Sequence, residues 1–296
     1  VSYHDAALVE PLACVLRGLE ETGVRAGDTV TIIGLRPIGL MFVRLAKVYG
    51  AQVIAIGNKP NGLNINDKVG STHIDTLQQA VREHSADFGI ALDGDGDRLM
   101  MCDADGTVFD GDQLLYIIAK HRRETGACKG GVVGTLMTNL ALEHALQKLD
   151  IPFARAKVGD RYVLETLLEK GWYWGGENSG HIICKDKHST GDGIISALQV
   201  LTALRMNKTS MGRYTQELRL YPQILINVPT ARGFKHGEHT AIGAAVQAAE
   251  HELRGKGRVL LRPSGTEPVL RVMVEGENEA QVRACAERIA AVVEAV

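Results

Sequence analysis

The sequence predicts an α/β fold in three parts: two three-layer αβα domains followed by a small α+β domain. Apolar runs of strand length alternate with amphipathic runs of helix length over most of the 296 residues, which is the pattern of α/β units. The last quarter changes to the order strand, helix, strand, strand, helix. The length also suits two or three domains of about 100–150 residues each.

The N-terminal elements follow from the apolar pattern. Residues 5–21 have the period of a helix, and residues 29–33 and 52–56 have the apolar character of strands. Pro37 suits the first turn of a helix that reaches Tyr49, so these elements make a βαβ unit.

An acidic loop lies between the next two predicted strands, 88–92 and 99–102. Asp75 is expected to cap a helix that runs to His84. Asp110 is expected to cap a second helix, which ends near Arg123.

A Gly-rich connection, residues 126–131, predicts the first domain boundary. After it, strands are expected near Val132, Phe153, Tyr173 and Ile182. The final block is expected to consist of a strand over 223–228, a helix over 241–253, strands over 259–261 and 269–274, and a helix over 279–293. The predicted division is an N-terminal helical segment, 1–25, two αβα domains, 26–126 and 127–221, and an α+β domain, 222–296.

Composition excludes several classes of protein. With 33 basic and 35 acidic residues the net charge is −2, which does not indicate a nucleic-acid-binding protein. The most apolar stretch, 29–57, is interrupted by Arg36, Arg44 and Lys47, so no membrane span is expected. Five scattered cysteines without a C-x-x-C pair indicate a reducing, cytoplasmic location. The chain begins with Val1 and no leader is recognised, which suggests a fragment or a processed chain.

Asp93, Asp95 and Asp97 alternate with glycines in the acidic loop, so three carboxylates can converge on one hard cation. An EF-hand loop starting at Asp93 would need Gly and Glu where Arg98 and Ala104 stand, so calcium binding of that kind is excluded. Three carboxylates with few other protein ligands suit Mg²⁺, which usually shares a substrate phosphate. The adjacent Arg98 could bind oxygens of that phosphate. The alternative is an ordinary Asp/Gly turn between strands.

Three other loops carry polar side chains suited to sugar phosphates. The segment 262–271 combines two arginines with small and hydroxyl residues, which is typical of an anion cradle, although a plain hairpin loop stays open. The segment 176–181 (GENSGH) suits sugar hydroxyls, and His181 can move protons near neutral pH. Residues 157–161 (KVGDR) form a similar but weaker signal.

Taken in this order, these loops resemble the α-D-phosphohexomutase superfamily from about residue 50 to residue 296. The resemblance includes the phrases PNGLNIN (60–66), ARAKVGDRYV (154–163) and VMVEG (272–276), and Asn178 resembles the branch that acts on glucosamine phosphates. It implies phosphohexomutase-type domains and interconversion of glucosamine 6-phosphate and glucosamine 1-phosphate, with a hexosamine phosphate as partner and a homo-oligomer left open.

The resemblance also implies site residues. Asp93, Asp95 and Asp97 would bind Mg²⁺, and Arg98 and His181 would be catalytic. The substrate-binding residues would be Lys157, Gly159, Asp160, Arg161, Glu177, Asn178, Ser179, Arg262, Ser264, Gly265, Thr266 and Arg271.

The family's phosphoryl carrier is a phosphoserine in a Ser-His-Asn-Pro type of loop, and no such tetrapeptide occurs in these 296 residues. Turnover by this chain alone is therefore expected to be impaired, because the reaction loses its donor. An alternative is a non-catalytic, sugar-phosphate-binding chimera.

Residues 4–56, with ALVEPLA (7–13) and GDTV (27–30), are similar to zinc-dependent medium-chain alcohol or sorbitol dehydrogenases. This suggests a fusion with its seam within 50–57. The Gly34–Gly39 loop resembles a dinucleotide fingerprint, but Arg36 replaces the glycine that lets the backbone approach a pyrophosphate. An NAD(P)-dependent dehydrogenase fragment is therefore a weaker alternative, and packing explains this segment better.

Overall fold

The computed structural model describes residues 61–231, 233–264 and 267–296, together with 16, 29–33, 47–48, 50, 52–57 and 59. It divides into two compact units, residues 1–138 with 146–217 and residues 139–145 with 218–296. The predicted helices over 5–21 and 37–49 lie almost entirely outside the described residues, and the Gly34–Gly39 loop lies wholly outside them.

The first sheet of unit one has the strand order β2-β1-β3-β4-β5. Its strands are β1 (Thr29–Ile33), β2 (Gln52–Ile56), β3 (Phe88–Leu92), β4 (Leu99–Asp103) and β5 (Val108–Phe109). The first three are parallel, whereas β4 and β5 run antiparallel to their neighbours. The parallel part therefore ends at β3, and the loop that follows β3 emerges at its carboxyl end.

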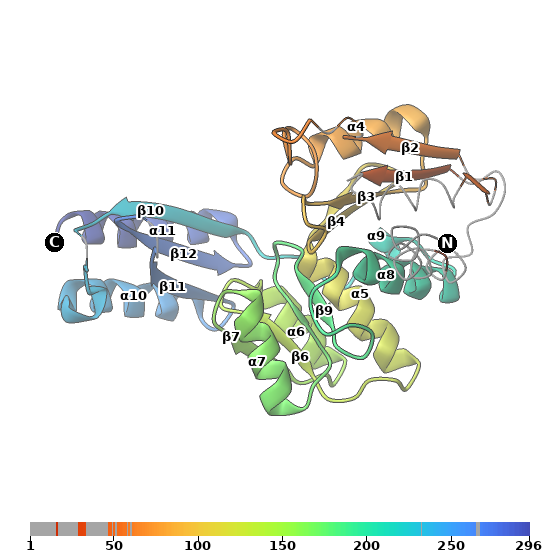
Figure 1. The fold of residues 1–296 in the computed structure, drawn as a ribbon. Helices are drawn as coiled ribbons and strands as arrows, with labels where there is room; N and C mark the ends of the chain where they lie inside the picture. Colours follow the sequence, from red (N-terminus) through yellow and green to blue (C-terminus); the bar gives the residue numbers. More distant parts are fainter. Residues whose placement is uncertain are drawn as a thin grey trace. The chain divides into compact units, whose positions relative to one another are not determined.

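Strand β1 hydrogen-bonds to a strand on either side, with Thr31 opposite both Ile54 and Gly89. The segment before Gly57 thus forms one sheet with the segment after it, as the fusion hypothesis requires. Helix α4 (Asp75–His84) packs on β3 and β4, with Leu77 and Val81 fully buried (Figure 1).

The second sheet of unit one has the order β7-β6-β8-β9. Its strands are β6 (Val132–Thr135), β7 (Phe153–Ala156), β8 (Trp174–Gly176) and β9 (Ile182–Cys184). The helices between residues 110 and 215 are α5 (Gly111–Glu124), α6 (Leu140–Lys148), α7 (Asp160–Lys170), α8 (Gly193–Met206) and α9 (Met211–Tyr214). Most of α6 belongs to unit two. Here too three parallel strands are followed by one antiparallel strand, β9.

Helix α7 covers this sheet through Val163 and Leu167, which pack against Val133, Ala156 and Ile183. Because α7 follows β7 directly, its first residues lie at the carboxyl end of the parallel strands. That position is where α/β sheets commonly bind ligands.

Unit two holds an antiparallel sheet in the order β10-β12-β11, with two helices packed on it (Figure 1). Its elements are β10 (Gln223–Pro229), a short 3₁₀ turn (His236–Glu238), α10 (Thr240–Leu253), β11 (Gly257–Pro263), β12 (Val269–Gly276) and α11 (Glu279–Glu294). Leu270, Val272 and Val274 alternate along β12 and join the core that α10 and α11 cover. The predicted strand and helix order is confirmed.

Of the two predicted helix caps, one forms. Asp110 accepts a hydrogen bond from the Gln113 N–H at 3.0 Å, and Gln113 Oε1 accepts one from the Asp110 N–H, a capping box. Asp75 does not cap α4; it lies inside the first turn, and the cap residue, Ile74, has no side-chain cap bond. Among the helices within the described ranges, none is long and apolar enough to cross a membrane.

Candidate functional site

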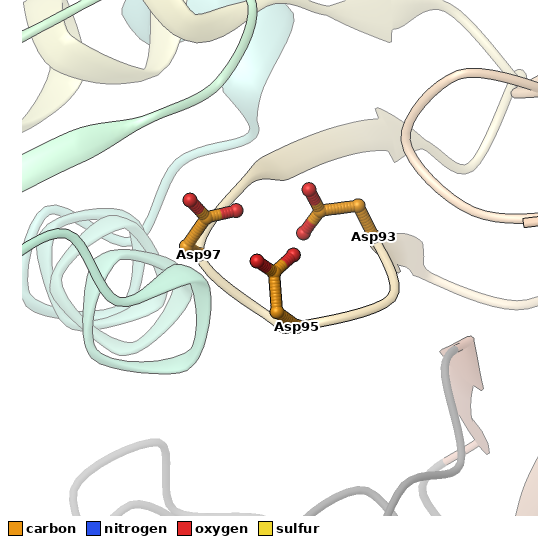
Figure 2. Close-up of side chains that lie close together, drawn as sticks. All are labelled: Asp93, Asp95 and Asp97. Atoms are coloured by element: carbon orange, nitrogen blue, oxygen red, sulfur yellow. The ribbon is translucent and has the colours of Figure 1, made fainter. Parts of the chain in front are cut away.

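The acidic loop joins β3 to β4, and its three carboxylates face one another (Figure 2). Ligand oxygens of Asp93, Asp95 and Asp97 all lie within 4.8 Å of one another. Asp95 is exposed, whereas the other two side chains are partly buried. The loop thus offers three anionic oxygens to a small space at the carboxyl end of the parallel strands.

Two glycines give the loop its shape. Gly96 has φ of +76°, which other residues rarely adopt. At Gly94 the constraint is steric, because a Cβ there would lie 2.3 Å from Ile65 Cδ1. The backbone conformation therefore favours glycine at position 96, and a side chain at position 94 would have to displace the exposed Ile65.

Asp93 is held by Arg98. The Arg98 backbone N–H donates to Asp93 Oδ1 at 3.1 Å, and Arg98 Nε lies 3.7 Å from Asp93 Oδ2. Burial raises the pKa of the Asp93 carboxyl; the hydrogen bond from Arg98 opposes this, and the neighbouring Asp97 and Asp95 add to it. A bound cation would offset both the repulsion between these carboxylates and the loss of their hydration.

His181 connects the acidic loop to the second sheet. Its Nδ1 lies 3.0 Å from Asp97 Oδ2, and the residue is 5% exposed. The backbones also meet, since Arg98 and His181 form a β-bridge and the Leu99 N–H donates to the Gly180 carbonyl at 3.0 Å. Both backbone and side-chain hydrogen bonds thus connect the acidic loop to the sugar loop (residues 177–181).

This junction has no room for side chains at two glycines. A Cβ on Gly180 would lie 2.2 Å from the Leu99 carbonyl oxygen, and one on Gly193 would lie 2.8 Å from the Arg98 carbonyl oxygen. The Gly193 N–H donates to the Gly96 carbonyl at 2.9 Å. The acidic loop is therefore fixed against both the sugar loop and the start of α8.

Glu177 in the sugar loop holds the segment 157–161. Its Oε1 accepts a hydrogen bond from the Gly159 N–H at 2.9 Å, just before α7 begins. Asn178 accepts through its carbonyl from the Gly111 N–H at 3.1 Å, while Ser179 is exposed. The structure thus brings two of the predicted substrate-binding segments together.

The basic side chains of segment 157–161 lie at the surface. Lys157 Nζ is 5.6 Å from the centre of the Tyr162 ring, and Arg161 pairs with Glu165 at 2.8 Å. Asp160 Oδ2 lies 3.9 Å from His181 Nε2, too far for a hydrogen bond. Both cations are available to a ligand at little cost, because exposed ion pairs contribute little.

The predicted phosphate loop lies in unit two, between β11 and β12. Arg262 and Arg271 are directly opposite one another across these antiparallel strands. Their Nε atoms are buried and, within the described part of the chain, have no hydrogen-bond partner. Opposed like charges whose buried Nε donors lack a partner are unfavourable, and an anion bound between the two guanidinium groups would relieve this.

The rest of this loop is partly ordered by its own contacts. Ser264 Oγ accepts from the Glu267 N–H at 3.2 Å, and Glu267 lies 3.6 Å from Arg271. Gly265 and Thr266 lie outside the described residues.

The acidic loop fits a hard divalent cation. Its donors are three carboxylates, the ligand type that Mg²⁺ prefers. Asp97 Oδ2 accepts from His181, whereas Asp97 Oδ1 is buried and has no hydrogen-bond partner among the residues described, so this oxygen could ligate a cation. Sequence reasoning found this cluster from its spacing.

Sequence reasoning missed the packing around His181. A Cβ on Gly191 would lie 2.0 Å from His181 Nε2, so this glycine forms a wall of the imidazole pocket. The only signal was a glycine in the polar segment 189–193, which cannot reveal a contact with a residue ten positions away.

Comparison with protein families decides the relationship. Three models of the phosphoglucomutase/phosphomannomutase family match in order: alpha/beta/alpha domain II at residues 39–106, alpha/beta/alpha domain III at 110–221 and the C-terminal domain at 225–292. The chain belongs to this family. Its architecture is accordingly that of αβα domains followed by a C-terminal domain.

Curated relatives are closely similar. The phosphoglucosamine mutase of Thiobacillus denitrificans is 60% identical over 246 residues, and that of Methylobacillus flagellatus is 64% identical over 245. Each match covers 83% of this chain and 54% of the relative. The chain therefore spans about half the length of the curated relatives it matches.

Solved structures share the fold. The Aspergillus fumigatus N-acetylphosphoglucosamine mutase, in complex with GlcNAc-6P and magnesium, superposes with a TM-score of 0.74 at 20% identity, covering 96% of this chain and 69% of that one. A phosphoglucomutase/phosphomannomutase family protein from Burkholderia thailandensis gives 0.71 at 19% identity, covering 94% and 63%.

The family matches also bear on the chain's divisions. The domain II match starts at residue 39, before the seam predicted within 50–57. The domain III match starts at residue 110 and includes α5, which the sequence analysis placed in the preceding domain. The resemblance of residues 4–56 to dehydrogenases stays a prediction.

Proposed function

We propose that this chain provides the metal-, sugar- and phosphate-binding parts of a phosphoglucosamine mutase, an isomerase that interconverts glucosamine 6-phosphate and glucosamine 1-phosphate. The observation that carries the proposal is the junction of the acidic loop with the sugar loop through Asp97 and His181. The 60% identity to phosphoglucosamine mutases supports the choice of glucosamine.

The proposed roles follow from the chemistry of each segment. Asp93, Asp95 and Asp97 would hold Mg²⁺, and Arg98, whose side chain is 45% exposed, would bind phosphoryl oxygens beside it. Glu177, Asn178 and Ser179 would bind the sugar, with Lys157, Gly159, Asp160 and Arg161 nearby. Arg262, Ser264, Gly265, Thr266 and Arg271 would bind the phosphate that does not react.

Mg²⁺, when bound, would stabilise the charge that develops on the transferring phosphoryl group. The chain's own residues bind and orient the sugar phosphate. Arg98 supplies a planar fork for two phosphoryl oxygens, and His181 keeps its Nε2 edge in a pocket close to the sugar loop. Positioning and charge compensation of this kind dominate phosphoryl transfer.

A reducing, cytoplasmic location belongs to the same proposal. Cys102 and Cys184 are buried free thiols. Burial raises the pKa of Cys102 to about 11 and that of Cys184 to about 12, so both stay neutral and unreactive at cellular pH.

The test uses two measurements on the 296-residue chain. Calorimetry with glucosamine 6-phosphate and Mg²⁺ should show binding that is tighter than for glucose 6-phosphate and that weakens when the metal is removed. Equal affinity for both sugars would contradict the glucosamine assignment, and no binding by folded protein would contradict the proposal.

A coupled assay for glucosamine 1-phosphate, with Mg²⁺ and a catalytic amount of bisphosphate, completes the test. Because these 296 residues hold no Ser-His-Asn-Pro sequence, we expect a rate no higher than that of Asp95→Asn. Metal-dependent turnover above that control would show that another residue of this chain carries the phosphoryl group.

A further inference from the structure

The hydrogen bond between His181 and Asp97 determines which nitrogen of the imidazole ring carries the hydrogen. Asp97 as a carboxylate only accepts hydrogen bonds, so the hydrogen lies on His181 Nδ1, 3.0 Å from Asp97 Oδ2. His181 Nε2 is buried and has no hydrogen-bond partner in the described part of the chain. The one strong bond that this side chain makes is therefore to a member of the acidic triad.

We infer that His181 is a positioning residue for the metal loop: its Nδ1–H fixes the Asp97 carboxylate in the orientation that lets the three aspartates converge. This rests on the metal site of the proposed function, not on its sugar chemistry. Groups that hydrogen-bond to a ligating carboxylate fix its orientation, and their loss typically costs 10–100-fold in metal affinity.

The pocket around the imidazole is built for one ring position. The β-bridge to Arg98 fixes the His181 backbone against the acidic loop. On the opposite edge, the Gly191 Cα is so close that a Cβ would lie 2.0 Å from Nε2 and 2.6 Å from both Cδ2 and Cε1. The Gly191 backbone therefore lies close against the Nε2 edge of the ring and limits its movement on that side.

His181 could act on the substrate or could position Asp97, and metal affinity distinguishes these two roles. A residue that served only substrate or proton transfer would leave metal affinity unchanged when replaced. A positioning residue changes metal affinity in the absence of any sugar phosphate, and a substitution that keeps a donor at the Nδ1 place preserves that affinity.

The experiment is a Mn²⁺ titration of the metal-free chain, with free Mn²⁺ followed by electron paramagnetic resonance. Three variants are compared: His181→Asn, whose amide nitrogen lies near the place of Nδ1, His181→Gln, whose amide nitrogen lies near the place of Nε2, and His181→Ala. Circular dichroism confirms that each is folded.

We expect His181→Asn to bind Mn²⁺ within about threefold of the wild type, and His181→Gln and His181→Ala to bind about 10–100-fold more weakly. Wild-type affinity in His181→Ala overturns the inference, and so does an equal loss in the Asn and Gln variants.

Gly191→Ala offers a second test away from the imidazole itself. Its methyl group should displace the ring from Asp97 and weaken Mn²⁺ binding about tenfold, although Gly191 is not a member of the acidic triad. Gly212→Ala is the matched control in the same unit, since a Cβ there meets only ordinary contacts at 3.6 Å or more. Unchanged affinity in folded Gly191→Ala contradicts the inference.

Asp95→Asn separates the failure of this inference from failure of the proposed metal site. If Asp95→Asn also left Mn²⁺ binding unchanged, the result would contradict the metal site itself.

Discussion

Each aspartate of the acidic loop has a different environment, although the three are spaced evenly in the sequence. Asp93 accepts from Arg98, Asp97 accepts from His181, and Asp95 is exposed. Replacing Asp93 or Asp97 would therefore disturb protein contacts as well as ligands. Asp95 is the position where the charge of the site can be changed with the least effect on folding.

Asp95→Asn should lower Mn²⁺ affinity by about tenfold or more, because one anionic ligand of three is neutralised. Its melting temperature without metal should stay within about 1 °C of the wild type, since exposed substitutions change stability little. Metal titration and thermal melting check this. The control is Asp105→Asn, an exposed acid in the turn after β4, which should bind metal normally; equal losses in both variants would argue against a localised site.

Alternating acids and glycines were enough to predict the metal cluster, because the ligands are local in the sequence. The contact between His181 and Asp97 spans 84 residues and arises from the meeting of two sheets, so no local pattern could reveal it. The opposed pair Arg262 and Arg271 is intermediate: both were predicted as anion ligands, but their register comes from β11 pairing with β12.

At the scale of elements, the two helix caps show why one prediction held and the other did not. Asp110 has extended backbone dihedrals, φ −82° and ψ 177°, which let its side chain turn back to the Gln113 N–H. Before α4 the preceding residue, Ile74, is already in a helical conformation, with φ −73° and ψ −20°. Asp75 therefore sits one position too late to cap, although its charge still favours the helix N-terminus.

Asp110→Ala should destabilise the chain by about 1 kcal/mol through loss of the cap, which lowers the melting temperature by about 2–4 °C. Asp110→Asn should keep most of the wild-type stability, since an amide oxygen can accept the same hydrogen bond. Thermal melting checks both variants. Equal destabilisation by Ala and Asn would show that the carboxylate charge, not the cap bond, matters.

His121 makes helix α5 sensitive to acid. Burial, and then the charge of Arg122, lowers the pKa of His121, which is 6% exposed. Its Nδ1 lies 3.3 Å from Asn207 Nδ2, so the neutral ring accepts a hydrogen bond there. Protonation would place two donors against each other.

Because the folded pKa of His121 is below the unfolded value, the unfolded state binds more protons between the two values. Stability is then complete above about pH 6.5 and falls as the pH drops below it. Urea unfolding from pH 7.5 to 5 should show this loss, and His121→Gln should flatten the slope. His84 is exposed, so His84→Gln should keep the wild-type dependence of the unfolding free energy on pH. If both variants flattened that dependence, His121 would not be its specific cause.

For the whole molecule, element order was predictable and its assembly was not. Nearly all strands appear where apolar runs indicated them, including β1 and β2 in the segment that resembles dehydrogenases. The sequence did not reveal that β1 lies between β2 and β3, because strand order depends on crossovers rather than on local patterning. The fusion hypothesis requires this placement, because β1 and β2 then belong to the sheet that carries the acidic loop.

The proposed function requires that the acidic, sugar and phosphate loops bind a hexosamine phosphate. The most direct measurement is calorimetry of the 296-residue chain with glucosamine 1,6-bisphosphate and Mg²⁺, comparing wild type, Arg262→Ala and the matched control Arg283→Ala. Arg283 lies on α11 and is 53% exposed, paired only with Glu279 among the described residues.

We predict metal-dependent binding by the wild type, an affinity at least about tenfold lower in Arg262→Ala because a charge-assisted hydrogen bond to phosphate is lost, and no change in Arg283→Ala. An absence of heat from folded wild-type protein, or wild-type affinity in Arg262→Ala, would contradict the account.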